Sequence, residues 1–418
     1  VGQHCGSLEY LLPEEYTTTL SVLHSKAPET SLEDVQKVLR HDMGVEVSDI
    51  FSSFDARPHG AASLAQVYKA TLKSTGETVA VKVQHPRVKP HSVVDMATME
   101  ALVRIVAKIF PDFNLMWLVE ETKKNLPREL DFLSEAKNAE RVRRMFQHLE
   151  FLRVPKIHWE HCTDRVLVME YCEGGQVNDL EYFRENRIDA HDVCRKLGKL
   201  YSEMIFVQGY VHCDPHPGNV LVNKKPNGSV ELVLLDHGLY ITLTDDFRLN
   251  YANLWLALLK PDQDAIKYWS KKMGVGDLYG LFACMVTARS WKSVTSGISK
   301  NVITADEACE IKRYAGSLLP QISDVLERMP RQMLLILKTN DLLRGIEYRL
   351  KTHNRADTFV QMARCCVRAV HEHAIRSTDV LWRQITLRVS MWFSLSKIYL
   401  YERYLIVSEL CSSPFASN

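Results

Sequence analysis

The sequence has almost no excess of either charge. Its 418 residues include 52 lysines and arginines against 51 aspartates and glutamates, a net charge of +1. Proteins whose main partner is nucleic acid usually concentrate basic side chains to bind the phosphate backbone, so the composition gives no electrostatic case for a nucleic-acid partner. A chain of this length can bury a large core and form two or three domains.

Long apolar runs and C-x-x-C motifs are also missing. No run of eighteen apolar residues occurs, which argues against a membrane-spanning helix. The ten cysteines are scattered and form no C-x-x-C pair, so we interpret them as thiols of a reducing compartment. The chain begins with Val1 and shows no signal-type segment, and we expect it to be a fragment or a processed form.

A dense motif stands in the centre of the chain. Residues 212–219 read H-C-D-P-H-P-G-N, and an apolar run after them ends at Asp236. Phosphoryl transfer needs one carboxylate to orient the attacking hydroxyl, an amide oxygen to help hold a metal, and a second carboxylate at a strand end to hold the same metal. Asp214, Asn219 and Asp236 meet these needs. The pattern predicts a kinase-like site that binds ATP or ADP with Mg²⁺.

Two other interpretations of this motif stay open from the residues alone. Asp, Pro, Gly and Asn are common in turns, so the segment could be a surface loop without chemistry. His212, Cys213 and His216 could belong to a metal site, although no further Cys or His cluster stands nearby to complete four ligands. The loop interpretation would make the spacing of the three motif residues a coincidence.

A second motif supplies a lysine where a kinase needs one to bind the α and β phosphates. Residues 66–71 and 78–83 have the composition of two strands joined by a turn, and Lys82 lies in the second, inside the apolar run V-A-V-K-V. Because apolar residues flank Lys82 on both sides, its side chain should point inward or have a partner. A further strand is predicted at 154–157.

The loop that would cover the phosphates contains alanine where glycine is expected. It lies just ahead of the predicted hairpin and includes Gly60, Ala61, Ala62 and Ser63. Protein kinases carry G-x-G-x-x-G here, because bare backbone can approach the phosphates and adopt positive φ. A methyl group restricts φ and fills space, so we expect nucleotide to bind differently than in an ordinary protein kinase.

In this order, the motifs resemble those of the UbiB, or aarF-domain, family of atypical kinases, and within it those of an animal subgroup. Residues 60–67 match the family's A-A-A-S-[IL]-A-Q-V, residues 79–86 its V-A-V-K-V-Q-H-P, and residues 212–219 its H-x-D-P-H-P-G-N. Glu129 and Asp131 match its E-x-D pair. The resemblance extends from the first residue to about residue 240.

The resemblance implies a role for each residue of the site. Lys82 would hold the phosphates of ATP or ADP and pair with Glu135. Asp214 would orient the acceptor hydroxyl or accept its proton. Asn219 and Asp236 would bind Mg²⁺.

Two further segments match the family at the edges of the site. The segment containing Glu170 and Cys172 resembles the hinge that receives adenine through backbone groups, although an ordinary strand leading into a turn would look the same. Gln3 ends a match to the family's K-x-G-Q motif, whose lysine would precede the first residue of the chain. In the family this extension packs over the active site, with its lysine near the acids matched by Glu129 and Asp131, and it disfavours protein-kinase activity.

The order of predicted elements indicates an α+β, two-lobed, protein-kinase-like fold with extra helices at the N-terminus, in the small lobe and at the C-terminus. We expect a helical extension over residues 1–50, a small lobe with inserted helices over 51–174, a helical large lobe with the catalytic loop over 175–350, and C-terminal helices packed on it over 351–418.

Local signals predict individual elements. Ser31 should cap a short helix that ends at Gly44. Helical spacing dominates residues 92–147, and Pro127 should lie in the first turn of the helix that carries the E-x-D acids and Glu135.

The phosphate acceptor is predicted to be a small or lipid-like molecule rather than a peptide. Protein kinases usually place a lysine two residues after the catalytic aspartate, where this chain has His216, as in the H-G-D-x-H-x-x-N loop of aminoglycoside and choline kinases. Thr244 should begin a helix soon after Asp236, which leaves no room for a long activation loop, and no A-P-E motif is present.

Two classes of function stay open. The first is an active kinase or ATPase, which the intact Lys82, Asp214, Asn219 and Asp236 favour. The second is a nucleotide-gated regulatory protein whose bound ATP or ADP sets a conformation read by protein partners without phosphate transfer; the alanine loop and the family's occluding extension favour it. The resemblance implies mitochondria, mitochondrial protein partners, and roles in lipid or quinone homeostasis and inner-membrane organisation.

The C-terminal segment 381–407 has the pattern of an amphipathic helix. It would place five apolar side chains on one face, interrupted by Arg388 and Lys397: Ile385, Val389, Trp392, Leu395 and Ile398. Such a face can lie on a membrane surface. Most amphipathic helices instead pack their apolar face on their own protein, and we favour burial against the large lobe.

Overall fold

The computed structural model describes Thr19, residues 29–109 and 116–297, Glu307, and residues 319–352 and 355–412. The chain divides into two compact units. The first draws on Val1–Val193, Cys213–Tyr240 and Lys338–Leu350, and the second on Cys194–His212, Ile241–Leu337 and Lys351–Asn418. These units follow contacts between distant segments rather than chain order, so the lobe boundaries expected from the sequence stay a prediction. All described residues of the predicted site belong to the first unit.

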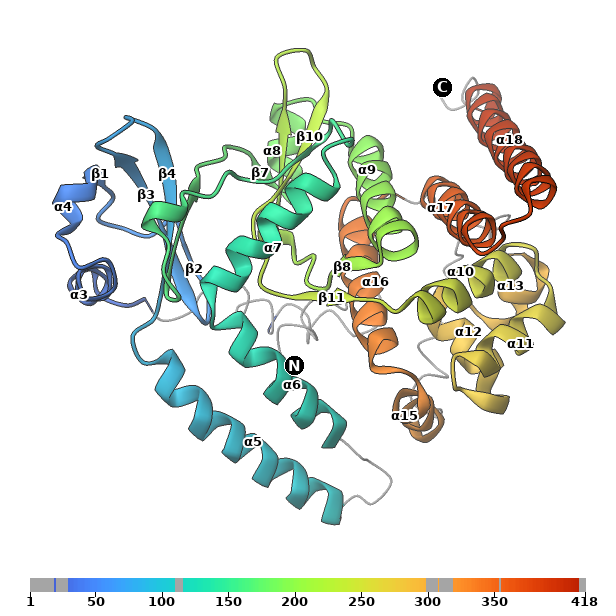
Figure 1. Cartoon of the computed structure of the whole chain (residues 1–418), viewed down its shortest axis with the longest axis horizontal. Coiled ribbons are helices and arrows are strands. Elements are labelled where there is room, and N and C mark those ends of the chain that lie inside the picture. Colours follow the sequence, from blue (N-terminus) through green and yellow to red (C-terminus); the bar gives the residue numbers. More distant parts are fainter. Residues whose placement is uncertain are drawn as a thin grey trace, which may run out of the picture. The chain divides into compact units, whose positions relative to one another are not determined.

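A five-stranded sheet forms one layer of the first unit (Figure 1). Its order is β1-β3-β4-β6, with β2 paired to β3; the strands are β1 (Phe51–Phe54), β2 (Gly60–Ala61), β3 (Ala65–Leu72), β4 (Thr78–Gln84) and β6 (Val166–Glu170). β3 and β4 form the predicted hairpin. Val79, Val81 and Val83 are buried on one face of β4. Side chains alternate along a strand, so Lys82 lies on the other face.

Helix α3 (Leu32–Met43) covers the valine face of the sheet. As predicted, it begins after Ser31, whose hydroxyl accepts a hydrogen bond from the Asp34 amide, and it ends at Gly44, which has a φ of 71°. Its Val35, Val38 and Leu39 join the strand valines in one apolar core. The short helix α4 (Val47–Ile50) then leads into β1.

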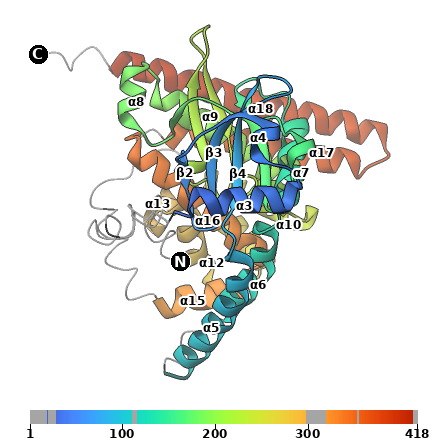
Figure 2. The same cartoon turned by 90° about the vertical axis from the view of Figure 1, so that its left-hand side faces the viewer.

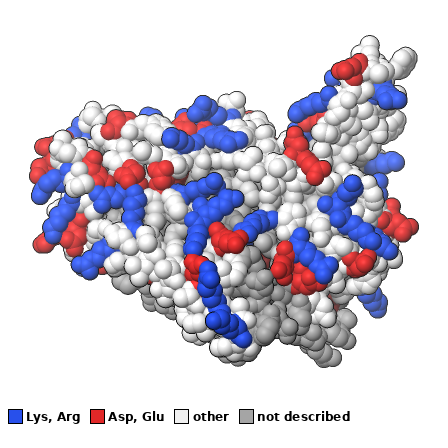
Figure 3. Space-filling view, turned by 60° about the horizontal axis from the view of Figure 1, so that its bottom comes forward, with Lys and Arg blue, Asp and Glu red and all other residues white. Residues whose placement is uncertain are grey.

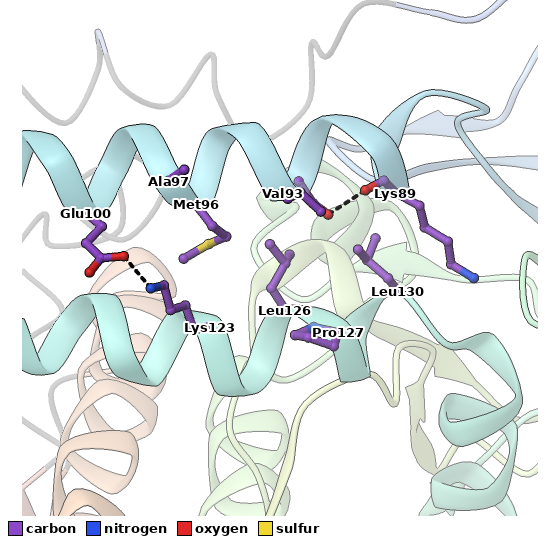
Figure 4. Close-up of a pocket in the computed structure, with 10 residues that line it drawn as sticks. Lys89, Val93, Met96, Ala97, Glu100, Lys123, Leu126, Pro127 and Leu130 are labelled. Atoms are coloured by element: carbon purple, nitrogen blue, oxygen red, sulfur yellow. Dashed lines mark hydrogen bonds and ion pairs between the residues drawn. The ribbon is translucent and has the colours of Figure 1, made fainter.

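Among the described residues, three helices follow β4 and precede the β5–β6 segment in sequence, as the helical spacing predicted: α5 (Val88–Ile109), α6 (Met116–Glu129) and α7 (Phe132–Met145). α5 and α6 run side by side (Figures 1 and 2). Between them is a pocket of about 540 Å³, with Met96 and Leu126 on its apolar walls and a Lys123–Glu100 ion pair at one end (Figure 4).

The predicted position of Pro127 is wrong. It lies near the C-terminal end of α6, and a separate helix, α7, begins after Asp131. Proline has no amide hydrogen to donate within a helix, so the last turn of α6 is weakened and the helix ends at Glu129. Asp131 is extended and caps the next helix by accepting a hydrogen bond from the Leu133 amide.

A second sheet in the first unit begins one of its strands directly after Asn219, the last residue of the central motif. Its order is β5-β10-β9-β7, with β5 (Leu152–Arg153), β10 (Val230–Leu234), β9 (Val220–Lys224) and β7 (Gly175–Gln176), and α8 (Leu180–Glu185) follows it. The strand predicted at 154–157 is wrong except for one bridge between Ile157 and Met169. Pro155 stands in that segment and cannot donate a hydrogen bond to a neighbouring strand.

The second unit is almost entirely helical in its described residues, as predicted from Thr244 onwards. Helix α9 (Ala190–Ser202), which begins in the first unit, continues into a π-helical turn that ends at Gly209, and the short strands β8 (Tyr210–His212) and β11 (Tyr240–Thr242) pair. The helices that follow in the second unit are α10 (Asp245–Leu259), α11 (Gln263–Lys272), α12 (Tyr279–Thr287), α13 (Trp291–Ser296), α15 (Leu319–Arg328), α17 (Arg355–Arg376) and α18 (Leu381–Ser412). Helix α16 (Arg331–Arg349) begins in the second unit, and from Lys338 onwards it belongs to the first unit. Thr244 caps α10.

The predicted burial of the C-terminal helix is wrong for Ile385, Val389 and Trp392, whereas Leu395 and Ile398 of the same predicted face are half-buried. α17 packs on α10, and α18 packs on α17. Ile385, Val389 and Trp392, which should have been buried, are 42%, 48% and 63% exposed. The reason is that α18 has one principal neighbour, so much of its circumference faces solvent. In the described part of the chain, no helix has both the length and the apolar character needed to cross a membrane.

Charged side chains of both signs are interspersed on the molecular face in Figure 3. This distribution agrees with the nearly equal numbers of basic and acidic residues in the sequence.

Candidate active site

Lys82 holds two carboxylates at once. Its Nζ lies 2.7 Å and 2.9 Å from the two carboxylate oxygens of Glu135, and 2.7 Å from Oδ2 of Asp236. Glu135 is in the first turn of α7, and Asp236 follows β10. Lys82 and Glu135 are 53 positions apart in sequence, and α5 and α6 take up most of that separation. An unusually long separation in sequence therefore still gives direct contact.

The charges of this cluster influence one another strongly. Burial alone would lower the pKa of Lys82, but Asp236 and Glu135 raise it above its ordinary value. Burial and the nearby Asp236 raise the pKa of Glu135 to about 7, although Lys82 opposes the rise. One ammonium group therefore faces two carboxyl groups. Its single positive charge cannot balance two carboxylates, so the cluster favours the binding of another cation.

The loop of the central motif is held in place by hydrogen bonds between its own polar groups. Residues 217–219 form a 3₁₀ turn, and His216 caps it by accepting a hydrogen bond from the Gly218 amide at Nδ1, 3.1 Å away. The side-chain amide of Asn219 donates to the carbonyl of Asp214 at 3.1 Å. The segment is therefore an ordered loop, and its prolines and glycine shape a turn that holds Asp214 and Asn219 together.

Strand pairing brings Asn219 to Asp236. Asn219 directly precedes β9 and Asp236 follows β10, and these antiparallel strands pair Val220 with Leu234. The amide of Leu235 also donates to the carbonyl of Asn219 at 2.9 Å. The start of one strand and the end of the next therefore meet at one edge of the sheet.

The oxygen donors of Asn219 and Asp236 fit Mg²⁺ that arrives with a nucleotide. Mg²⁺ commonly takes one or two protein ligands and completes its shell with phosphate oxygens and water. Among the described residues, no group of three His, Cys, Asp or Glu side chains is arranged to hold a metal ion without such help. In particular, the residues around His212 and His216 give no support to a structural metal site of that kind.

Asp214 is paired with a lysine that the motifs did not reveal. Nζ of Lys338, on α16, lies 3.0 Å from Oδ1 of Asp214. The two residues are 124 positions apart, and the helical C-terminal part of the sequence contains no motif that would single out Lys338. Only the folded chain reveals this contact.

The two acids of the E-x-D motif have different surroundings. Burial raises the pKa of Glu129 to about 7, and the carboxylate of Asp214 adds to the effect. Lys338 opposes it, so Glu129, Asp214 and Lys338 act on one another electrostatically. Asp131 instead caps the N-terminus of α7, because its carboxylate accepts hydrogen bonds from the Leu133 amide and the Ser134 hydroxyl.

The predicted phosphate loop, formed by Gly60, Ala61, Ala62 and Ser63, is anchored to the sheet. Gly60 and Ala61 form β2, and the carbonyl of Ala62 lies 3.0 Å from Nε2 of His85, the histidine of the V-A-V-K-V-Q-H-P motif. Gly60 does not have positive φ, and a Cβ on it would meet no atom within 4 Å. This conformation does not require glycine, which suits a loop in which alanine stands at the next two positions.

The predicted hinge is partly engaged in other contacts. The Glu170 side chain forms an ion pair with Arg153, and the backbone amide of Glu170 donates a hydrogen bond to the backbone carbonyl of Lys156. Burial raises the pKa of the Cys172 thiol to about 11, so this side chain is a neutral, apolar group. Adenine would have to use backbone groups beyond the Glu170 amide. Gln3 and its motif lie outside the described residues.

Comparison with known proteins identifies a family. Residues 22–270 match the model of the ABC1 atypical kinase-like domain. Mouse AarF domain-containing protein kinase 1 is 56% identical over 411 residues, which cover 98% of this chain and 78% of the mouse protein. AarF domain-containing kinase 1 of Drosophila melanogaster is 54% identical over 408 residues, which cover 96% of this chain and 78% of the fly protein.

A solved structure supports the fold. The structure of Rv3197 with erythromycin, from Mycobacterium tuberculosis, aligns with 83% of this chain and 88% of that one, with a TM-score of 0.53 and 20% sequence identity. At this identity the likeness concerns the fold alone. The predicted α+β kinase-like fold and the resemblance to the animal aarF-domain kinase 1 subgroup are both confirmed. The chain belongs to the ABC1, or AarF-domain, family of atypical kinases.

Proposed function

We propose that this chain binds Mg²⁺ with ATP or ADP and transfers the terminal phosphate of ATP to a small or lipid-like hydroxyl compound, or to water. The observation that carries the proposal is the double ion pair of Lys82 with Glu135 and Asp236, next to the loop that joins Asp214 to Asn219. A lysine held by one acid and shared with a metal-binding acid is the arrangement that phosphoryl transfer requires.

Each group would have a defined task. Lys82 would bind the α and β phosphates, while Glu135 fixes its direction. Asp214 would accept the proton of the acceptor hydroxyl, as the acceptor oxygen bonds to the terminal phosphorus and the bond from that phosphorus to the bridging oxygen of ADP breaks. Asn219 and Asp236 would hold Mg²⁺, which neutralises phosphate charge when bound.

Two features favour a small or lipid-like acceptor over a peptide. His216 stands where protein kinases usually carry a lysine, and its Nδ1 is used to cap the loop turn. The chain passes from Asp236 through the short strand β11 to the Thr244 cap of α10, so no long activation segment intervenes.

We further propose that α18 binds a membrane surface, where a lipid-like acceptor would be found. Its exposed side chains include Leu381, Trp382, Trp392 and Phe393, and basic residues such as Arg388 lie among them. Aromatic and basic side chains on one helix suit the interface of an anionic bilayer. An address in mitochondria, with protein partners there, stays a proposal that rests on the family resemblance.

The alternative proposal is a nucleotide-gated regulatory protein that transfers no phosphate. The alanine-containing loop favours it, because the methyl groups of Ala61 and Ala62 occupy space that the glycines of protein kinases leave to the phosphates. Both proposals require binding of the Mg–nucleotide complex. Release or transfer of the terminal phosphate of ATP distinguishes them, because only the first proposal predicts it.

Nucleotide binding is tested by thermal unfolding with Mg²⁺ and ADP. Ligand at 100 times its dissociation constant adds about 2.7 kcal/mol to the free energy of unfolding and should raise the melting temperature. Asp236→Asn should lose most of this rise, because it removes a metal ligand, and chelation of Mg²⁺ should do the same to the wild type. Equal rises for the wild type and Asp236→Asn would contradict the metal assignment.

A further inference from the structure

Lys338 presents its ammonium group to the proposed catalytic aspartate. Nζ of Lys338 is 3.0 Å from Oδ1 of Asp214, and the two side chains are 32% and 39% exposed. Both residues belong to the first compact unit. The pair therefore lies at an accessible site where a substrate can approach Asp214.

The usual source of a cation at this place is missing. Protein kinases carry a lysine two residues after the catalytic aspartate, and this chain has His216 there. His216 accepts a hydrogen bond at Nδ1 from the Gly218 amide, so its ring is held by the turn that carries Asn219. The cation next to Asp214 comes instead from α16.

A cation is useful at this position for an electrostatic reason. The terminal phosphoryl group carries negative charge on its three outer oxygens while it moves between two oxygens, and a carboxylate base beside it repels that charge. An ammonium group next to the base offsets the repulsion. Lysine has a flexible four-carbon stem, so Nζ can remain near Asp214 while it turns toward a phosphate oxygen.

Lys338 also acts on a second acid of the cluster. Its positive charge favours the ionised form of Glu129, which Asp214 disfavours. The positive charge of Lys82 likewise favours the ionised forms of Glu135 and Asp236, with which it forms ion pairs. The site thus has two lysines with different partners: Lys82 beside the metal-binding acid and Lys338 beside the base.

We propose that Lys338 replaces the missing loop lysine: it positions Asp214 and binds the terminal phosphate of ATP. This inference rests on the proposed function, because it assumes that the terminal phosphate lies near Asp214. It predicts that Lys338 distinguishes ATP from ADP, since ADP has no phosphate at that position.

The first test measures dissociation constants of Mg–ADP and of a Mg-bound, non-hydrolysable ATP analogue. Lys338→Met should weaken the analogue about tenfold and leave ADP within twofold of the wild type. Lys225→Met is the matched control, because Lys225 is 33% exposed and also forms an ion pair, with Glu231 at 3.1 Å. The control should change neither constant. Unchanged analogue affinity in Lys338→Met, or equal weakening of both ligands, would overturn the inference.

The second test measures phosphate release in a double-mutant cycle. Lys338→Met should lower kcat about 100-fold, a loss typical of removing one group that stabilises developing charge. If Lys338 acts through Asp214, adding Lys338→Met to Asp214→Asn should lower kcat by less than about threefold relative to Asp214→Asn alone. Losses that multiply in the double variant would show that the two residues act independently and would overturn the positioning role.

The two tests separate the inference from the function on which it rests. If the wild type releases no phosphate but Lys338→Met still selectively weakens the ATP analogue, phosphoryl transfer fails and the phosphate-binding role of Lys338 stands. Lys338→Arg keeps the charge and should keep at least a third of the wild-type analogue affinity. If Lys338→Met does not fold, Lys338→Gln, which removes the charge but stays polar, replaces it in both tests with the same expected results.

Discussion

At the scale of single residues, the site is organised by acids that share a small number of cations. Lys82 binds Glu135 and Asp236, and Lys338 binds Asp214. Glu129 lies close enough to the second group for its pKa to be raised to about 7 by burial and by Asp214. An excess of acid over base of this kind favours the binding of a cation together with a polyphosphate.

Asp131 provides a residue-scale prediction, because its carboxylate caps α7, the helix that carries Glu135. Asp131→Ala should lower the free energy of unfolding by about 1 kcal/mol, as expected for loss of an N-cap, and the loss can be measured by urea unfolding. Asp131→Ser keeps an oxygen that can accept from the helix amides and should recover most of the stability. If Asp131→Ser were as unstable as Asp131→Ala, the negative charge rather than the cap would be the important property.

At the scale of elements, two junctions assemble the site. The β9–β10 pairing joins Asn219 to Asp236 at one edge of a sheet. The break between α6 and α7 separates the two E-x-D acids, so that Glu129 ends one helix and Asp131 caps the next. Each junction depends on local chemistry: strand register in the first, and a proline followed by a capping aspartate in the second.

An ion pair ties α3 to the sheet and gives a prediction about pH. Burial disfavours the charged form of Asp42, but hydrogen bonds from Arg165 and His41 outweigh it and hold the pKa of Asp42 below its ordinary value. A carboxyl group with a lowered pKa in the folded state stabilises the fold above its unfolded pKa of about 3.9, and this stability is lost as the pH falls through the folded pKa.

The ion-pair prediction is checked by urea unfolding at pH 6 and at pH 3. Asp42→Asn should be less stable than the wild type at pH 6, and the difference should shrink at pH 3, because the wild type then loses part of the stability that the charge of Asp42 contributes. The exposed pair of Lys37 with Asp34 serves as a control, because surface pairs contribute little, and Asp34→Asn should have a small effect at either pH. A constant difference between Asp42→Asn and wild type at both pH values would contradict the ion-pair explanation.

Helix α18 gives the second element-scale prediction. If it binds a bilayer surface, the chain should sediment with vesicles of anionic phospholipid, and added salt should weaken binding because screening reduces the attraction of its basic residues. Replacing Trp382 and Trp392 together by serine should lower the bound fraction at least tenfold. Tyr268, on α11, is 54% exposed, and Tyr268→Ser is a control that should leave binding unchanged. Equal binding by both variants would exclude α18 as the contact.

At the scale of the whole molecule, the sequence predicts what local motifs encode. It leads to the fold, the hairpin with Lys82 and the three residues of the central motif, because each depends on short segments with distinct chemistry. It misses Lys338, because that contact arises from packing of α16 against a loop 124 residues away. The exposure of α18 is missed for a related reason: an amphipathic pattern does not specify whether a partner helix covers the face.

Phosphate turnover by the protein on vesicles, with a hydroxyl-bearing lipid or small molecule present, tests the kinase proposal most directly. The wild type should release or transfer the terminal phosphate of Mg–ATP. Asp214→Asn should lower the rate at least 100-fold while it keeps the melting-temperature rise with Mg–ADP, since Asp214 acts on the acceptor rather than on the nucleotide. Equal turnover by the wild type and Asp214→Asn, or none by either, would contradict phosphoryl transfer at this site.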